Sequence, residues 1–160
     1  MLFRPKDING WDTSNAYKMQ YMFYNAKAFN DEVNSWDVSQ VTAFSKMFFS
    51  AQNFDKDVNG WQVDSAGNMN YMFFQASNFN SELNSWNVTQ VTQAFRMFNT
   101  ATSFDKDVNG WTLSSITNAN QMFLGASAFN QCLNSWPGTF PSSALTDNMF
   151  DNTACPSLNS

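Results

Sequence analysis

The sequence predicts a right-handed α/β solenoid of six coils, each with one short strand and one helix. The first observation is a tryptophan that recurs every 25 residues, at Trp11, Trp36, Trp61, Trp86, Trp111 and Trp136. The second is a Met-Phe pair with the same interval from Met22-Phe23 to Met122-Phe123, whose last copy, Met149-Phe150, comes two residues late. A fixed period of this length is typical of repeat proteins, in which each unit buries its apolar side against the next.

The repeats divide residues 1–160 into six units of a single domain. A weaker 50-residue period overlies the first, because FDKDVNGW occurs at 54–61 and again at 104–111. The alternate units read FNDEVNSW, FNSELNSW and FNQCLNSW at the same position, so units two apart are the more alike. The units are placed at 4–28, 29–53, 54–78, 79–103, 104–128 and 129–160.

Each unit contains a predicted strand. Leu83, Trp86, Val88 and Val91 have the apolar spacing of a leucine-rich-repeat strand, with tryptophan in a leucine position. We expect a short strand near residues 85–89, with successive side chains on opposite faces. The right-handed winding follows from the preferred hand of connections between parallel strands.

A helix is predicted after each strand. Val41, Phe44, Phe48 and Ala51 are spaced i, i+3, i+7 and i+10, which is one face of a helix of about three turns. The chain contains seventeen Phe, nine Met and six Trp. Because Leu and Ile are scarce in each unit, these large side chains must fill the space between the strand and helix layers.

The stretch SWDVSQVTAFSKMFFSAQNFDKDVNGW resembles the 25-residue repeat of BspA-type leucine-rich-repeat surface proteins, a group that includes a domain of mycoplasma lipoproteins. The shared features are the SW-x-V strand, the Val-Thr helix start at Val41-Thr42 and Val91-Thr92, the Met-Phe-x-x-Ala helix and the Phe-Asn or Phe-Asp turn. The resemblance covers essentially the whole chain. It implies an extracellular or cell-surface protein linked to adhesion, and it carries over no catalytic site.

Composition and charge argue against several classes of function. The formal charge is −5, and the eight Lys and Arg residues are spread singly, so no phosphate-neutralising patch exists and nucleic acid is not an expected partner. No apolar run approaches the roughly 20 residues that span a bilayer, so membrane insertion is not expected. There is no histidine to act as a base, and the carboxylates repeat in every unit, so no catalytic residue is assigned and no enzyme is expected.

Two cysteines, Cys132 and Cys155, lie near the C-terminal end. We predict that they form a disulfide that staples a C-terminal cap, which implies an oxidising compartment. The alternative is that both are free thiols in the core.

An asparagine also recurs once per unit. An inward asparagine would hydrogen-bond backbone groups of its own coil and of the next, which predicts a structural ladder rather than a ligand site. Its members are Asn9, Asn34, Asn59, Asn84, Asn109 and Asn134.

An acidic residue recurs once per unit in the first five units, and this acidic column suggests a bound cation as an alternative: Asp7, Glu32, Asp57, Glu82 and Asp107. The pattern D-x-D-x-N-G occurs twice and matches the opening of a calcium loop. The twelfth position is Ala66 or Ile116 instead of glutamate, so an EF-hand is excluded, and calcium between adjacent coils is kept only as an alternative. No other cofactor is expected. The four candidate ligands are Asp55, Asp57, Asp105 and Asp107.

Two surfaces are candidate binding sites. The first is the polar face of the strands, whose short side chains suit a glycan or a polar protein surface: Asp12, Asp37, Ser39, Gln62, Asp64, Asn87, Thr89 and Thr112. The second is an aromatic stripe on the outer face of the helices, which either contacts a protein partner or packs against neighbouring helices. The aromatic stripe consists of Tyr21, Tyr24, Phe49, Tyr71 and Phe74.

The sequence therefore predicts a non-enzymatic extracellular or cell-surface protein that acts in adhesion or self-assembly through an extended surface. Its partner would be a protein or glycan surface, or another copy of the chain. Two alternatives are kept. One is a structural subunit of a filament, built by contacts that propagate from copy to copy. The other is a carbohydrate-binding module that uses the polar strand face.

Overall fold

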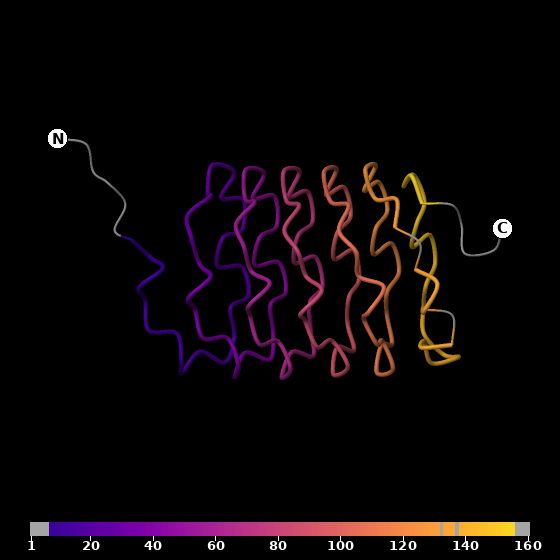
Figure 1. The fold of residues 1–160 in the computed structure, drawn as a ribbon, viewed down its shortest axis with the longest axis horizontal. Helices are drawn as coiled ribbons and strands as arrows, with labels where there is room; N and C mark the ends of the chain where they lie inside the picture. Colours follow the sequence, from indigo (N-terminus) through magenta and orange to yellow (C-terminus); the bar gives the residue numbers. More distant parts are fainter. Residues whose placement is uncertain (1–6, 132, 137, 156–160) are drawn as a thin grey trace.

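The chain winds into a stack of coils along one axis, in a computed structural model that describes residues 7–131, 133–136 and 138–155. Successive coils follow one another from the N-terminal to the C-terminal end, so segments one repeat apart lie side by side (Figure 1). The described residues form no helix and no extended strand, and their β-pairing consists of isolated parallel bridges. These bridges connect, in order along the stack, Lys18, Ala43, Asn68, Gln93, Asn118 and Leu145.

The predicted leucine-rich-repeat-like α/β solenoid is therefore wrong in its secondary structure, since the described coils contain neither the expected helix nor the expected strand. The segment expected to be a helix, 41–51, is mostly a run of tight turns. The segment expected to be a strand, 85–89, belongs to a short connection with turns on both sides. Trp86 and Val88 are buried and Asn87 is exposed, so the side chains alternate as in a strand although no β-ladder forms there.

Hydrogen bonding explains why the turn segment is not helical. We call residues 44–51 and the equivalent segments 19–26, 69–76, 94–101, 119–126 and 146–153 the turn runs. The N–H of Met47 donates to the carbonyl of Phe44 in the same coil at 3.0 Å. The N–H of Phe48 donates to the carbonyl of Met72 in the next coil at 2.9 Å. Because alternate N–H groups bond to the next coil, the continuous i to i−4 pattern of a helix cannot form.

Each turn run contains two residues with positive φ. In one run these are Lys46, at 59°, and Ser50, at 53°. A positive φ at the third residue of a turn defines type II, so two such turns follow each other along the run. The left-handed conformation costs about 1–2 kcal/mol per residue other than glycine. The equivalent positions are Tyr21, Asn25, Tyr71, Gln75, Arg96, Thr100, Gln121, Gly125, Asn148 and Asn152.

The helix prediction failed because the turns repeat every four residues, which gives an apolar spacing close to that of a helix. Phe44 and Phe48 are four residues apart, as are Met47 and Ala51, and all four are fully buried. A helix places buried side chains at an average period of 3.6 residues. Over a segment of two turns, the two periods select the same residues, so the pattern does not separate a helix from a turn run.

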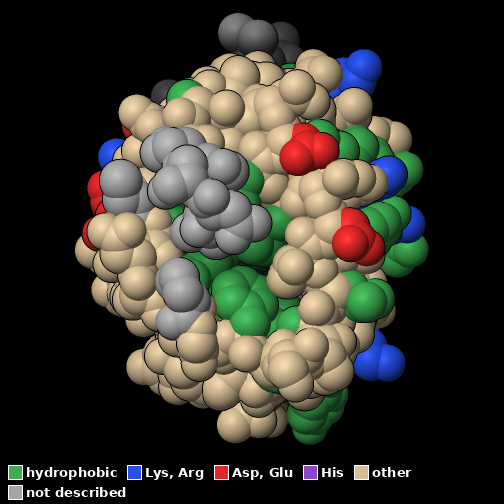
Figure 2. Space-filling model, turned by 90° about the vertical axis from the view of Figure 1, so that its right-hand side faces the viewer, with side chains coloured by type: hydrophobic (Ala, Val, Ile, Leu, Met, Phe, Trp, Pro, Cys, Tyr) green, Lys and Arg blue, Asp and Glu red, His purple; other side chains and the backbone are tan. Residues whose placement is uncertain are grey.

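A rod of aromatic rings runs through the centre of the stack. Phe73 stacks on Phe48 of the preceding coil and on Phe98 of the following coil, with 5.5 Å between ring centroids in both cases. Trp86 and Trp111 stack in a second column at 6.3 Å. Seen from the C-terminal end, hydrophobic side chains occupy the centre of the molecule (Figure 2). The aromatic-rich composition thus reflects a core of columns that stack from coil to coil.

The tryptophans also set the register between coils. Nε1 of Trp61 donates to the carbonyl of Val33 at 3.0 Å, and Nε1 of Trp86 donates to the carbonyl of Val58 at 2.9 Å. The acceptor therefore lies 28 residues back, on the preceding coil. A slip of one coil against another would break both the ring stacking and this hydrogen bond.

The predicted disulfide-stapled cap pairs Cys155 with Cys132, and Cys132 lies outside the described residues. Among the residues that the structure describes there is no disulfide. Cys155 Sγ lies 3.2 Å from the carbonyl oxygen of Gln131. Aromatic packing joins the last coil to the preceding one, because Phe150 stacks on Phe123 with 5.6 Å between ring centroids.

Relief of backbone strain should stabilise the fold at Thr100. This β-branched residue has a φ of 56°, whereas asparagine tolerates the left-handed region well. We expect Thr100→Asn to raise the free energy of unfolding by about 0.5–1 kcal/mol in urea denaturation. The control, Thr102→Asn at an exposed position outside the positive-φ set, should change it by less than about 0.5 kcal/mol. Destabilisation by Thr100→Asn would contradict this account of the turn runs.

Candidate binding surfaces

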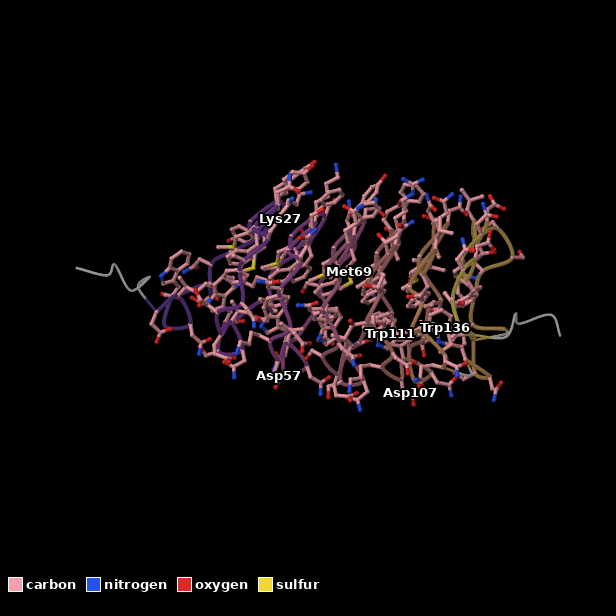
Figure 3. The ribbon with its side chains drawn as sticks, turned by 90° about the horizontal axis from the view of Figure 1, so that it is seen from above. Lys27, Asp57, Met69, Asp107, Trp111 and Trp136 are labelled. Carbon is pink, nitrogen blue, oxygen red and sulfur yellow. The ribbon has the colours of Figure 1, made fainter. Side chains whose placement is uncertain are left out.

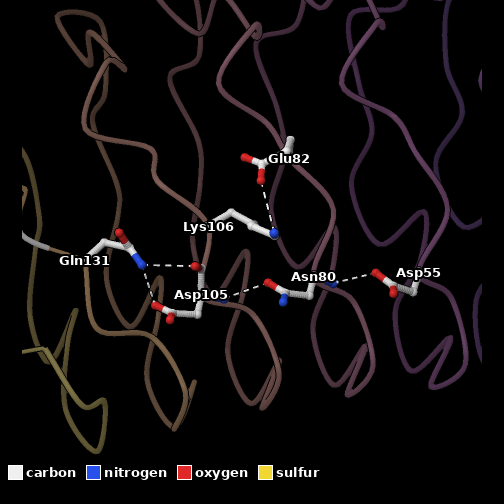
Figure 4. Close-up of polar contacts among 6 residues, drawn as sticks. All are labelled: Asp55, Asn80, Glu82, Asp105, Lys106 and Gln131. Atoms are coloured by element: carbon white, nitrogen blue, oxygen red, sulfur yellow. Dashed lines mark hydrogen bonds and ion pairs between the residues drawn. The ribbon is translucent and has the colours of Figure 1, made fainter.

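A ladder of side-chain hydrogen bonds follows the core phenylalanines, and the sequence analysis did not identify it. At each rung, the Asn or Asp after the phenylalanine accepts the N–H of its equivalent in the next coil. The N–H of Asn80 donates to Asp55 Oδ1 at 2.8 Å, and the N–H of Asp105 donates to Asn80 Oδ1 at 3.0 Å (Figure 4). The repeated Phe-Asn and Phe-Asp pairs were the available signal. The ladder consists of Asn30, Asp55, Asn80, Asp105 and Asn130.

The four aspartates considered for calcium have separate hydrogen-bonding roles. Asp55 and Asp105 belong to the ladder, whereas Asp57 Oδ1 accepts the N–H of Asn59 in its own coil at 2.8 Å. Asp107 repeats the arrangement of Asp57. No three acidic, histidine or cysteine side chains come together as metal ligands anywhere in the described part of the chain.

Lysines of the next coil pair with two members of the acidic column. Lys56 Nζ lies 2.9 Å from Glu32, and Lys106 Nζ lies 3.0 Å from Glu82 (Figure 4). Such partly exposed pairs are each worth about 0.2–1 kcal/mol. They reduce the repulsion between carboxylates that are stacked from coil to coil.

The asparagine column is divided between two environments. Asn9, Asn59 and Asn109 are half-buried, and the Oδ1 of each accepts the N–H of a serine in the next coil, for example Ser85 for Asn59 at 3.0 Å. The alternate members, Asn34, Asn84 and Asn134, are exposed. The structural role thus follows the 50-residue period, with one bonded asparagine for every two coils.

The polar face is exposed along the stack, although no sheet supports it. Six of its eight predicted residues are exposed, and Ser39 and Thr89 are half-buried. A depression of about 270 Å³ opens on this face beside Gly60, whose missing side chain leaves open space. Asp37, Ser39 and Gln62 line the depression, so the structure brings three of the predicted residues together.

Hydrogen bonds hold the carboxylates of this face in position. Asp37 Oδ1 accepts both the Ser39 hydroxyl at 2.7 Å and the Ser39 N–H at 3.0 Å. These two bonds favour the ionised form and lower the pKa of Asp37. Ser14 lowers the pKa of Asp12 in the same way, one coil earlier.

The aromatic stripe forms a continuous column on the turn runs rather than on helices. Phe49 stacks between Tyr24 and Phe74, with centroid distances of 4.7 Å and 4.6 Å. Tyr71 packs against Phe74 at 5.6 Å. Tyr21 and Tyr24 are 53% and 42% exposed, and the other three members are half-buried. The rings therefore pack on one another and also reach the surface.

Two cations, which the sequence analysis did not include, complete this surface. Lys46 Nζ lies 5.2 Å from the ring centroid of Tyr21 and 5.3 Å from that of Tyr71. The Arg96 guanidinium lies 5.1 Å from the ring centroid of Phe95. Lys46 and Arg96 occupy the repeat position of Tyr21 and Tyr71, which is the signal that could have found them. We call Lys46, Arg96 and the five residues of the aromatic stripe the aromatic–basic ridge.

One part of each of the first five coils contains no carboxylate. The segments 15–28, 41–53, 65–78, 91–103 and 115–128 contain four basic residues and no carboxylate. Lys27, in one of these segments, lies at the opposite edge of the stack from Asp57 and Asp107 (Figure 3). From the end of the stack, Lys and Arg side chains are seen mainly along one side of the outline (Figure 2).

The ladder predicts a sharp difference between two substitutions at Asp105, whose Oδ1 accepts the N–H of Asn130 and the Nε2 of Gln131. Asp105→Ala removes the acceptor, and we expect a loss of about 1–2 kcal/mol in the free energy of unfolding. Asp105→Asn keeps a side-chain oxygen, as at Asn80, and should cost less than about 0.5 kcal/mol. Equal losses in chemical denaturation would mean that the ladder is not what stabilises this position.

The serine bonds make a second prediction, for pH titration. In Ser39→Ala, the pKa of Asp37 should rise because the hydroxyl donor is lost, while the pKa of Asp12 should stay close to its original value. A lowered folded-state pKa stabilises the fold above the unfolded-state pKa, and this contribution is lost as the pH falls through the folded-state pKa. Carboxyl-detected NMR titration measures both groups in one experiment, and an unchanged Asp37 would refute the assignment.

Comparison with known proteins identifies the family of the chain. The family described as "Mycoplasma protein of unknown function, DUF285" matches residues 2–98 and residues 65–159. No curated protein matches the chain, and no solved structure does. The described residues contain no helix that is long and apolar enough to cross a membrane. Since the two overlapping matches cover nearly every repeat, the chain belongs to DUF285, a Mycoplasma repeat family of unknown function.

Proposed function

We propose that this protein is a non-enzymatic extracellular or cell-surface protein that acts in adhesion or self-assembly through an extended surface. The observation that carries the proposal is the aromatic–basic ridge. Isolated aromatic rings are normal on protein surfaces, whereas contiguous exposed rings are typical of interaction sites. Tyrosine and arginine, which both occur in the ridge, are also enriched among the residues that dominate binding energy.

The stack holds the ridge in place before any partner binds. Tyr24 and Phe74 are both stacked on Phe49, and the backbone beneath them is hydrogen-bonded from coil to coil. Side chains that are already ordered lose little conformational entropy on association. A rigid ridge therefore supports binding more effectively than the same side chains on a mobile loop.

Backbone strain at the ridge gives further support. Tyr21, Lys46, Tyr71 and Arg96 all have positive φ, where glycine or asparagine would be less strained. Every turn run has the same backbone conformation, and at these four positions it holds large aromatic or basic side chains. Strained backbone positions are often found at functional sites.

The non-enzymatic character and the location are parts of the same proposal. Asp55 and Asp105 are occupied by the backbone ladder, and Glu32 and Glu82 are paired with lysines. These carboxylates act as structural groups in a repeated pattern. The resemblance of the repeats to those of BspA-type surface proteins supports a location outside the cell.

A carbohydrate-binding role for the polar face is a second candidate. The depression beside Gly60 supports it, because Asp37, Ser39 and Gln62 line it and have carboxylate, hydroxyl and amide side chains. Such groups can bond to adjacent sugar hydroxyls. The carbohydrate candidate uses the polar face and the adhesion proposal uses the ridge, so one experiment can test both functions.

Beads coated with the purified chain should adhere to one another or to a cultured epithelial layer. We expect the triple variant Tyr24→Ser, Phe49→Ser, Phe74→Ser to lose at least about tenfold of this adhesion, because it removes the stacked column of the ridge. The matched control is Gln62→Ala with Asn87→Ala on the polar face, which should adhere as the parent does.

Circular dichroism would confirm that both variants fold. Adhesion lost only in the polar-face variant would assign binding to the carbohydrate candidate. Beads coated with the parent chain that adhere neither to one another nor to the epithelial layer would refute the proposed function.

A further inference from the structure

The two cations of the ridge are separated by two coils. Lys46 and Arg96 occupy the same repeat position and are 50 residues apart. Lys46 Nζ is held between the rings of Tyr21 and Tyr71, and Arg96 Nε donates to Gln121 Oε1. Both cations are half-buried and oriented by neighbouring side chains. They therefore form a preorganised pair of positive charges.

A pair of exposed carboxylates has the same separation. Asp57 and Asp107 are also 50 residues apart, and both project at one edge of the stack (Figure 3). Each is held by a bond from an N–H two residues ahead in its own coil. Within the described residues neither forms an ion pair. We call these two residues the acidic edge.

The neighbouring lysines do not neutralise this edge. Lys56 precedes Asp57 in the chain, but its Nζ pairs with Glu32 of the preceding coil. Lys106 likewise pairs with Glu82. Asp57 and Asp107 thus keep their negative charge available to a partner.

The common repeat makes the two spacings equal. Stacked backbone segments lie about 5 Å apart, so a two-coil separation is about 10 Å for the cations and for the carboxylates alike. A partner that engages both cations must present two anions at this pitch. A second copy of the chain meets the requirement automatically, because the same coil length sets both distances.

We propose that the aromatic–basic ridge of one copy binds the acidic edge of a second copy, so that the chains associate side by side. Lys46 faces one carboxylate of the edge and Arg96 faces the other, and the aromatic rings exclude water around the ion pairs. The two surfaces are different, so the contact is heterologous and each copy keeps one ridge or one edge open for a further copy. This inference rests on the proposed function and names the partner of the ridge.

Salt is the first test, by sedimentation of the full chain over a range of concentrations. Electrostatic screening acts over about 30 Å at 0.01 M salt and about 3 Å at 1 M. We expect association at the lower salt and at least about tenfold weaker association at the higher salt. A chain that is monomeric under both conditions, or that associates equally in both, overturns the proposal.

Charge reversal on each surface tests the pairing directly. Lys46→Glu with Arg96→Glu should abolish self-association, and so should Asp57→Lys with Asp107→Lys. An equimolar mixture of the two variants should associate again, because the basic ridge of the second variant meets the acidic edge of the first. Failure of the mixture to associate, with both variants folded by circular dichroism, overturns the assigned contact.

A matched control separates this contact from a general effect of charge. Asp37→Lys with Asp64→Lys makes the same change in net charge on the polar face, and it should leave self-association at the parent level. If a reversed variant fails to fold, Lys46→Gln with Arg96→Gln takes its place and should weaken association. Beads that adhere to epithelial cells while the chain stays monomeric in solution would refute side-by-side pairing and leave the proposed function standing.

Discussion

Hydrogen bonding between the backbones of adjacent coils is the constraint on which the rest of the structure depends. In each turn run, alternate N–H groups close local turns and the others bond to the next coil, as those of Met47 and Phe48 do. Eleven of the described residues other than glycine adopt positive φ to make this possible. At about 1–2 kcal/mol each, the strain is comparable to the whole net stability of a typical domain, about 5–15 kcal/mol. The stacked core and the bonds between coils must therefore offset it.

Fixed register converts sequence repeats into columns. The core columns conserve chemistry from coil to coil, because phenylalanine stacks on phenylalanine and tryptophan on tryptophan. Polar groups follow the same rule in the Asn and Asp ladder and in the indole N–H bonds. In the described part of the chain, every side-chain nitrogen or oxygen that is buried, in a residue that is not itself exposed, has a hydrogen-bond partner. A coil can therefore be added without leaving buried polar groups unsatisfied.

The surface columns vary where the core columns do not. One column reads Tyr21, Lys46, Tyr71, Arg96 and Gln121 along the stack, so aromatic and basic side chains alternate in its first four members. Each side chain is placed by the same turn geometry, and each is exposed or half-buried, so packing constrains its chemistry less than it does in the core. The stack thus acts as a scaffold with a constant interior, on which an interaction surface is specified by one residue per coil.

The sequence by itself determined the repeat length, the residues of the core and the position of the aromatic stripe. These features depend on periodicity, and a period of 25 residues is visible whatever backbone carries it. The choice between helix and turn run was not visible, because Phe44 and Phe48 satisfy both periods over so short a segment. That choice rests on the bonds to the next coil.

Tertiary structure also decided which polar side chains became structural and which remained available. Asp55 and Asp57 are two residues apart and look alike in the sequence, yet one bonds to the next coil and the other projects at the edge. Lys46 became part of the ridge because stacking places it between two tyrosines that are 25 residues away on either side. Such neighbours depend on how the coils stack, and local sequence preferences do not contain that information.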